Sequence, residues 1–220
     1  MYAGSMHTLY QVISAAFCVI VVVSNIISAK MVSCPLPFFD NLIIPAGLIT
    51  YPFTFLLSDL VTEIFGAKKA KLMVYIAFAM SLVSFALIQL ALVLPAAAVS
   101  DQAAFHAILG LSGLRIFSSL TAYLVSQLVD IQLYAWIKAW TGPKMLWLRN
   151  NGSTCVSQVV DTVVIDILFL YWGLKMPMSE VWPIMLFAFG YKSFFSIANT
   201  PLFYACVYLI TKWERISASP

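Results

Sequence analysis

The chain has 220 residues, of which 62% are hydrophobic and only 10% are charged, and its formal net charge is +3. Soluble domains carry roughly 45–50% apolar and about 25% charged residues, so this composition excludes a water-soluble surface. The small, scattered positive charge also argues against nucleic acid as a partner. At about 20 residues for each membrane-spanning helix, the length leaves room for about six spans. Length and composition therefore predict an all-α integral membrane protein.

Apolar runs interrupted by charge, proline and glycine give the position of each span. The four cysteines show no C-x-x-C pattern and no Cys/His ligand spacing, so we expect no metal site, no disulfide framework and no cofactor. We interpret residues 1–220 as a single transmembrane domain. Its predicted spans lie at about 9–31, 43–65, 71–95, 114–137, 153–173 and 181–211.

Basic residues gather in alternate loops, which indicates the orientation of the spans. They follow the second, fourth and sixth spans, whereas the opposite loops are nearly free of them. By the positive-inside rule, both termini are expected in the cytoplasm. The basic residues are Lys68, Lys69 and Lys71, then Lys138, Lys144 and Arg149, then Lys212 and Arg215.

A short internal repeat links the second and fifth spans. The second reads S-D-L-V-T-E from Ser58 to Glu63, and the fifth reads S-Q-V-V-D-T from Ser157 to Thr162. With three spans in each half, the two halves enter the membrane in opposite directions. This pattern predicts a 3+3 inverted repeat, an arrangement in which transporters place their substrate site between the halves.

Polar side chains recur inside the apolar spans, where each charge costs roughly 2.5–3.5 kcal/mol at the bilayer centre. Spacings of three or four put two side chains on one helix face, whereas Asp166, five residues after Asp161, is expected to point elsewhere. Tyr51 and Tyr191 flank the polar positions and would stack on a planar ligand. The candidate substrate-binding residues are Gln158, Asp161, Gln127, Asp130, Lys192, Asn25, Asp59, Glu63, Tyr51 and Tyr191.

The same residues have a structural interpretation. Hydrogen bonds between membrane helices commonly use such side chains, Lys192 would pair with Asp161 or Asp130, and Asp59 and Glu63 would meet Lys68 or Lys69. The intramembrane acids nevertheless outnumber Lys192, the one base well inside a span. This excess favours a polar cavity that hydrates the acids and presents them to a solute.

Longer motifs then resemble a known family. They are Y-P-F-T-F-L-L-S-D-L-V-T-E-I-F-G from Tyr51 to Gly66, R-I-F-S-S-L-T-A-Y-L-V-S-Q-L-V-D-I from Arg115 to Ile131, and L-W-L-R-N-N-G-S-T from Leu146 to Thr154. This text is similar to that of the queuosine precursor transporters, also called vitamin uptake transporters. Asn199 departs from the family pattern, in which an acid often stands at this place.

The resemblance implies a six-helix uptake protein of the bacterial inner membrane for the 7-deazaguanine bases preQ0, preQ1 or queuine. It implies a secondary or facilitative carrier with alternating access, similar in architecture to the substrate-binding S components of energy-coupling-factor importers. For such a base, Asp161 with Gln158 would face Asp130 with Gln127 as a two-sided clamp. The aminomethyl cation of preQ1 would favour a further acid, with Glu63 or Asp59 as candidates.

A membrane enzyme and a bare S component are the two alternatives to a carrier. A membrane enzyme is disfavoured, because the chain has no H-E-x-x-H, G-x-S-x-G, Walker A or G-x-G-D motif. The alternative function is a bare S component that needs a separate energy-coupling ATPase module. The expected partners are therefore a small-molecule solute and membrane lipid, with monomer and homodimer both left open.

Overall fold

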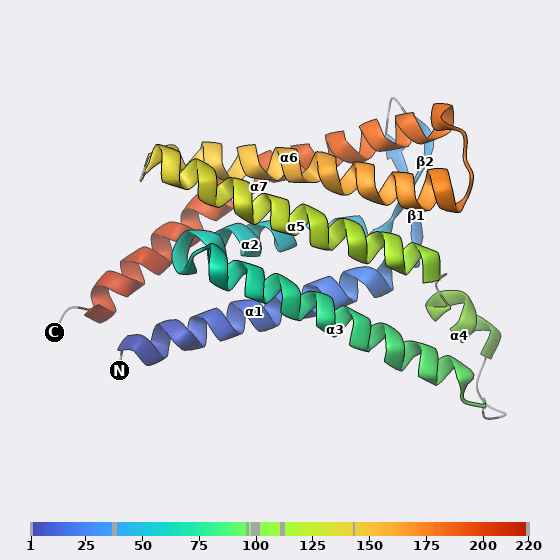
Figure 1. The fold of residues 1–220 in the computed structure, drawn as a ribbon, viewed down its shortest axis with the longest axis horizontal. Coiled ribbons are helices and arrows are strands. Elements are labelled where there is room, and N and C mark those ends of the chain that lie inside the picture. The colour runs from blue at the N-terminus through green and yellow to red at the C-terminus, as the bar shows by residue number, and fades with distance from the viewer. Residues whose placement is uncertain are drawn as a thin grey trace.

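The computed structural model describes residues 2–36, 39–95, 97, 102–110, 113–142 and 144–218 of the chain. In this part of the chain, six helices are long and apolar enough to cross a membrane. They run back and forth along an elongated bundle, with the first and last described residues at one end and the strands at the other (Figure 1). We call these the terminus end and the hairpin end. The predicted helical membrane class is confirmed, with one small β-hairpin added to it.

The connections between the helices differ from those that the sequence predicted. The first candidate span ends at Ile27 and the second begins at Ala46, because two antiparallel strands lie between them. The hairpin, a short helix at the hairpin end and a π-helical segment were not predicted. The elements are α1 (Tyr2–Ile27), β1 (Met31–Leu36), β2 (Phe39–Pro45), the 3₁₀ helix η1 (Ala46–Thr50), α2 (Tyr51–Phe65), α3 (Ala67–Val93), α4 (Gln102–Leu109), α5 (Gly113–Thr141), α6 (Leu146–Asp166), the π-helix η2 (Ile167–Gly173) and α7 (Met178–Ala218).

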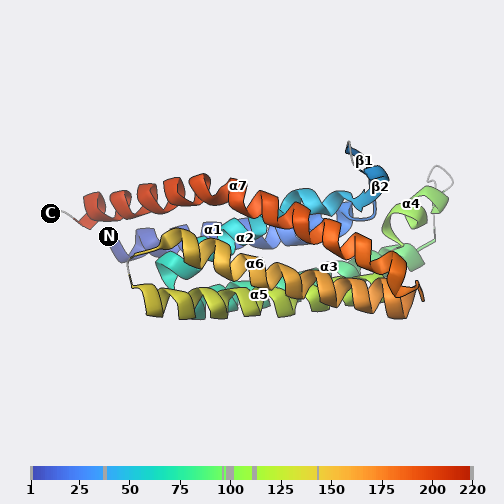
Figure 2. The same cartoon turned by 90° about the horizontal axis from the view of Figure 1, so that it is seen from above.

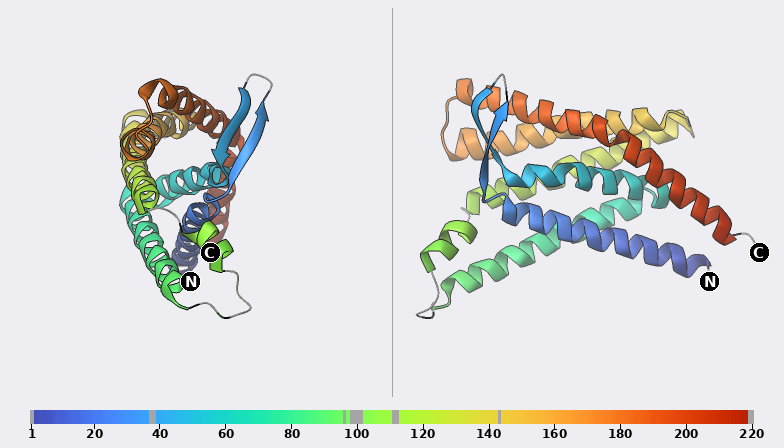
Figure 3. Two further views of the ribbon diagram at one scale, coloured as in Figure 1. Left: turned by 90° about the vertical axis from the view of Figure 1, so that its right-hand side faces the viewer. Right: turned by 180° about the vertical axis from the view of Figure 1, so that it is seen from behind.

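Helix α2 occupies the centre of the bundle. It contacts α1, α3, α5 and α7, and an end-on view shows it among the other helices (Figure 3). Eight of its residues, all between Thr54 and Thr62, are buried, so the helix has no lipid-facing stripe in this stretch. Its polar positions Thr54, Ser58 and Thr62 recur every four residues and therefore share one face.

Helix α3 shows the opposite pattern and marks the lipid-facing surface. Its buried residues Ala70, Met73, Val74, Ala77 and Ser81 follow the three- and four-residue spacing of a single helix face. Large apolar side chains occupy the rest of its circumference and are exposed, which suits contact with lipid. They include Leu72, Tyr75, Ile76, Met80, Leu82, Val83, Leu87 and Leu90.

Helix α7 is the longest element and contains two interior prolines, Pro183 and Pro201. Proline lacks a backbone N–H and its ring clashes with the preceding turn, so each one interrupts the helical hydrogen bonds. Figures 2 and 3 show α7 changing direction along its length before it reaches the terminus end. The helix thereby packs against α6 over one part and against α2 over another.

The connection from the hairpin into α2 depends on a close approach at Gly47. A methyl group placed on this residue would lie 2.7 Å from the Ser24 carbonyl oxygen of α1, and it would also contact the Ser28 hydroxyl. The Ser24 hydroxyl donates a hydrogen bond to the Gly47 carbonyl at 3.3 Å, and Thr50 donates to Ser24 Oγ at 2.6 Å. A residue without a side chain therefore lets η1 lie directly on the end of α1.

We expect Gly47→Ala to destabilise the protein by about 1–3 kcal/mol, the usual cost of forcing an extra methyl group into a filled space. Thermal unfolding in detergent measures the effect. Gly190→Ala is the matched control, because a methyl group there meets nothing within 4 Å. Equal melting temperatures for the two variants would show that η1 is not closely packed on α1.

Candidate functional site

The site begins with helix α6, whose buried surface is polar over its whole length. All nine of its buried residues are polar or charged, although the helix belongs to a candidate membrane span. They recur at alternating spacings of one and three, with a last step of four, which places them along one broad face. Neighbouring helices must therefore satisfy these groups, because lipid cannot. The residues are Arg149, Asn150, Ser153, Thr154, Ser157, Gln158, Asp161, Thr162 and Asp166.

Asp161 is the centre of the largest network on this face. Lys192 of α7 donates to its Oδ2 atom at 2.6 Å, and the Tyr51 hydroxyl of α2 donates to the same oxygen at 2.5 Å. Ser126 of α5 donates to Oδ1 at 3.2 Å. One carboxylate near the middle of the Leu146–Gly173 span therefore joins four helices. Between the two partners for Lys192 that the sequence left open, the structure shows Asp161.

The environment of Lys192 explains how a cation is tolerated at this depth. Its side chain is only 5% exposed, and its ammonium also donates to Thr162 Oγ1 at 3.3 Å. The same nitrogen lies 4.4 Å from the centroid of the Tyr51 ring, which is within the range of a cation–π interaction. Tyr51 thus contacts both members of the ion pair.

Two cavities lie on either side of this network and share Tyr51, Phe55 and Lys192. The larger one encloses about 1060 Å³ of empty space, its open mouth included, and extends toward the hairpin end. Its polar lining consists of Ser24, Asn25, Ser28, Thr50, Tyr51, Thr54, Ser119, Tyr123, Ser126, Gln127, Asp161, Asp166 and Lys192.

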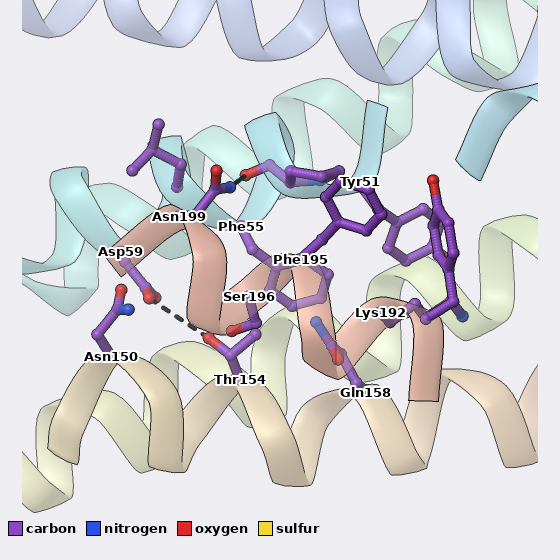
Figure 4. Close-up of a pocket in the computed structure, with 13 residues that line it drawn as sticks. Tyr51, Phe55, Asp59, Asn150, Thr154, Gln158, Lys192, Phe195, Ser196 and Asn199 are labelled. Atoms are coloured by element: carbon purple, nitrogen blue, oxygen red, sulfur yellow. Dashed lines mark hydrogen bonds between the residues drawn. The ribbon is translucent and has the colours of Figure 1, made fainter. Parts of the chain in front are cut away.

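The smaller cavity has an empty volume of about 370 Å³ and extends toward the terminus end. Figure 4 shows Gln158 and Thr154 of α6 across from residues of α7, with Asp59 of α2 beside Thr154. Thr154 donates to Asp59 Oδ2 at 3.4 Å, and Asn199 donates to the Pro52 carbonyl at 2.8 Å. The residues around it are Tyr51, Pro52, Phe55, Leu56, Asp59, Asn150, Thr154, Gln158, Tyr191, Lys192, Phe195, Ser196 and Asn199.

The structure brings eight of the ten predicted site residues to these cavities. Asn25, Gln127 and Asp161 line the larger one, Asp59, Gln158 and Tyr191 line the smaller one, and Tyr51 and Lys192 line both. Asp130 and Glu63 line neither of the two. The four residues of the expected clamp, Asp161, Gln158, Asp130 and Gln127, therefore do not converge on a single cavity.

Asp130 is buried between helices. Its carboxylate accepts a hydrogen bond from the Ser157 hydroxyl at 2.9 Å, and its side chain interacts with that of Asp59. One oxygen of each of these two acids has no hydrogen-bond donor among the described residues. Asp130 thus adjoins the smaller cavity through Asp59 rather than facing it.

Glu63 belongs to an ion network at the terminus end, and its expected pairing with Lys68 or Lys69 was wrong. Arg149 donates to its Oε1 atom at 2.7 Å, Lys138 lies 3.2 Å from its Oε2 atom, and Tyr134 donates to Oε2 at 2.9 Å. The sequence placed Arg149 in a loop. Helix α6 begins at Leu146 instead, which carries the Arg149 side chain into the bundle, where it is 3% exposed.

Several cavity residues were not predicted, although some carried a signal. Thr154 stands four residues before Gln158 and so lies on its face. Asp166 was expected to point away from Asp161, yet both residues line the larger cavity. In a regular α-helix, residues five apart diverge by about 140°. Side chains from the other helices close a broad cavity around both positions, which the spacing of one helix does not reveal.

The atoms that lack partners define what the cavities offer a ligand. Among the described residues, four buried oxygens of cavity-lining side chains have no hydrogen-bond partner: Gln127 Oε1, Asp166 Oδ2, Gln158 Oε1 and Asp59 Oδ1. Buried acceptors are normally paired, because an unpaired one costs about 1–3 kcal/mol. The arrangement therefore suits a solute with several N–H donors.

Comparison with known proteins now gives the family. The family model described as "Putative vitamin uptake transporter" matches residues 45–206, which hold both cavities apart from a few residues of α1. The chain belongs to this family. The assignment supports a transporter role for the protein, and no solved structure matches the chain.

Two bacterial relatives agree with the family assignment. A "Probable queuosine precursor transporter" of Bacillus subtilis (strain 168) is 30% identical over 174 residues, covering 78% of this chain and 75% of the relative. A protein of the same name from Haemophilus influenzae is 25% identical over 146 residues, covering 62% of this chain and 56% of the relative. Both names describe transporters and not enzymes.

We expect Lys192→Met to destabilise the protein by about 3–5 kcal/mol, because it leaves the Asp161 charge buried without its cation. Adding Asp161→Asn should recover part of this loss, so that the double variant is more stable than Lys192→Met alone. Thermal unfolding of the single and double variants in detergent measures the coupling.

Lys138→Met is the control for this cycle. The Lys138 side chain is 36% exposed, and Glu63 keeps Arg149 when Lys138 is lost. Its loss should cost no more than about 1 kcal/mol. A Lys192→Met variant as stable as Lys138→Met would contradict a role for the central ion pair in holding the helices together.

Proposed function

We propose that this transporter imports queuosine precursors, the 7-deazaguanine bases preQ0, preQ1 or queuine, and performs no catalysis. The observation that carries the proposal is a membrane-buried cavity with unpaired acceptor oxygens. A 7-deazaguanine has donors at N1, at the exocyclic amine and in the five-membered ring. Gln127 Oε1 in the larger cavity, or Gln158 Oε1 and Asp59 Oδ1 in the smaller one, would accept these hydrogen bonds.

The remaining recognition groups suit a flat heterocycle. The O6 acceptor of the base needs a donor, which the Lys192 ammonium or a glutamine NH₂ group supplies. Tyr191 lies with its ring centroid 4.7 Å from that of Phe195, and Tyr51 stacks on Phe55 at 6.0 Å. All four rings line the smaller cavity, so an entering base would find aromatic faces at the boundary between the two spaces.

Asp161 would not act as a free acceptor in this arrangement. Both of its oxygens already accept hydrogen bonds from protein groups. A ligand that reached it would have to compete with Lys192 and Tyr51. We therefore assign Asp161 to the network that separates the two cavities, and we assign the first contact with the base to the unpaired oxygens.

The positions of the cavities support alternating access by a secondary or facilitative carrier. The larger cavity extends toward the hairpin end and the smaller toward the terminus end, with Tyr51, Phe55 and Lys192 between them. Two membrane spans are irregular next to the larger cavity, because η1 precedes α2 and the π-helix η2 follows α6. Interrupted helices at the substrate site are common in transporters.

The proposed 3+3 inverted repeat relates α2 to α6, and their polar faces meet. Aligning the two short motifs matches Asp59 with Gln158, and both of these residues line the smaller cavity. Tyr51 of α2 also donates to Asp161 of α6. The contact between the matched spans supports a substrate path at the interface of the two halves.

We place the protein in the bacterial inner membrane with the terminus end in the cytoplasm. The basic residues Lys68, Lys69, Lys71, Lys138 and Lys144 lie next to the helix ends at that end, and they outnumber Lys30, Arg115 and Lys175 at the hairpin end, as the positive-inside rule favours. The larger cavity then extends toward the outside. The structure is accordingly assigned to a state that receives solute from the exterior.

We expect the purified protein to bind one of the three 7-deazaguanines more tightly than guanine, and Gln127→Leu and Gln158→Leu to weaken that binding by about tenfold each. Each change replaces a polar cavity group that a donor-rich ligand would pair with. Isothermal titration in detergent measures the affinities. Gln132→Leu is the control, because Gln132 is exposed on α5 and contacts Lys71 rather than a cavity.

Uptake should require this chain alone. In a bacterial host that lacks queuosine synthesis, precursor uptake and energy-coupling ATPase modules, its expression with an added precursor should restore queuosine in tRNA. Restoration only after an ATPase module is supplied would favour the S-component function instead. Failure of every 7-deazaguanine to bind the folded protein would refute the proposed substrate.

Orientation can be tested by labelling single cysteines in a variant that lacks the natural ones. A cysteine at position 180, exposed at the hairpin end, should react in intact cells with a membrane-impermeant maleimide. A cysteine at position 68, exposed at the terminus end, should react only after the membrane is opened. The reverse pattern would place the terminus end outside.

A further inference from the structure

Asp166, the last residue of α6, is a buried acid on which the Lys192 charge acts, but to whose Oδ2 atom no described residue donates a hydrogen bond. It is 9% exposed. The side chain lines the larger cavity, which has an open mouth toward the hairpin end. Asp166 therefore stands where an entering solute would meet it.

The charges around this cavity do not balance. Among the described residues that line it, Asp161 and Asp166 are acids and Lys192 is the one base. Lys192 is committed to Asp161 Oδ2 at 2.6 Å and to Thr162 Oγ1 at 3.3 Å. Arg115, a base at the same end of the bundle, does not line the cavity and donates to the Ser28 carbonyl. The cavity thus carries one acid in excess.

An unpaired carboxylate at membrane depth is costly, so its presence needs a compensating group. No structural role accounts for Asp166 in the way that helix contacts account for Asp161 and Glu63. Phe187 lines the same cavity. An acid and an aromatic ring on one cavity are groups that bind an ammonium ion.

Asp166 lies apart from the cavity groups that are proposed to hydrogen-bond the edge of the base. Five residues along α6 correspond to about 7.5 Å between Asp161 and Asp166, with Asp166 nearer the hairpin end. A planar base held at the depth of Gln127 and Tyr51 would therefore direct a substituent, rather than its hydrogen-bonding edge, toward Asp166.

We propose that Asp166 binds a protonated amine on the solute and thereby selects bases that carry an ammonium group. This inference rests on the proposed function and narrows it. Among the 7-deazaguanines, preQ1 has an aminomethyl group that is protonated at neutral pH, whereas preQ0 has a neutral nitrile at the same position. The two substituents have the same number of heavy atoms and differ in charge.

The test is titration of preQ1 and preQ0 into the purified protein and into Asp166→Asn, which keeps the size of the side chain and removes its charge. The unaltered protein should bind preQ1 at least about tenfold more tightly than preQ0. Asp166→Asn should weaken preQ1 binding by about ten- to hundredfold, the range of a charge-assisted hydrogen bond, and leave preQ0 binding within about threefold. Asp166→Glu should retain the preference for preQ1.

Glu180→Gln is the matched control, since it removes an exposed acid at the same end of the bundle and should not change either affinity. Retained preQ0 binding shows that Asp166→Asn is folded. An equal loss for both ligands would overturn the inference and assign Asp166 to the hydrogen-bonding edge of the base, and no loss for either would also overturn it. If neither ligand binds the unaltered protein, this inference fails, and the proposed function fails with it only if queuine does not bind either.

Discussion

The architecture depends on one constraint: lipid cannot satisfy the polar groups of α6, so protein partners or a polar cavity must do so. A polar group that faced the hydrocarbon would lose several kcal/mol that a soluble protein would recover from solvent. The ion pair of Lys192 with Asp161 meets this constraint at the centre of the bundle. Tyr51 and Ser126 complete it, and their four helices are thereby fixed at one depth. Apolar packing of α1, α2 and α3 around Phe17, Val61 and Met73 then surrounds a polar centre.

The buried acids divide into groups with separate tasks. Glu63 is held by Arg149 and Lys138 and joins α2, α5 and α6 at the terminus end. Asp161 is held by Lys192 and separates the two cavities. Asp59 and Asp166 keep unpaired oxygens that line the cavities. Asp59 also interacts with the buried Asp130, whereas no described residue donates a hydrogen bond to Asp166 Oδ2, so Asp166 is the acid that is most available to a solute.

Much of this organisation was predictable from residue types and spacing. The number of long apolar helices follows from hydrophobic length, and the shared face of Gln158 and Asp161 follows from helical periodicity. Partner choice was not predictable, because it depends on how helices rotate against one another: Arg149 joins the membrane bundle only because α6 begins at Leu146. The β-hairpin and η2 were also absent from the prediction, since apolar residues in strands and π-helices resemble those in α-helices. The shared cavity of Asp166 and Asp161 shows the same limit. Several helices enclose that cavity, so the sequence of one helix does not determine which residues line it.

The length of α7 has a consequence for the way the protein sits in its lipid environment. At 1.5 Å for each residue, its 41 residues extend for about 60 Å, roughly twice the hydrocarbon thickness. Hydrophobic mismatch therefore cannot fix the height of α7, and the Lys192 contact at the centre of the bundle does so instead. The candidate span of α1, with 22 residues or about 33 Å, is close to the thickness of the bilayer. Adaptation to thicker or thinner membranes thus falls on the tilt of the shorter helices, while the depth of the polar centre remains constant.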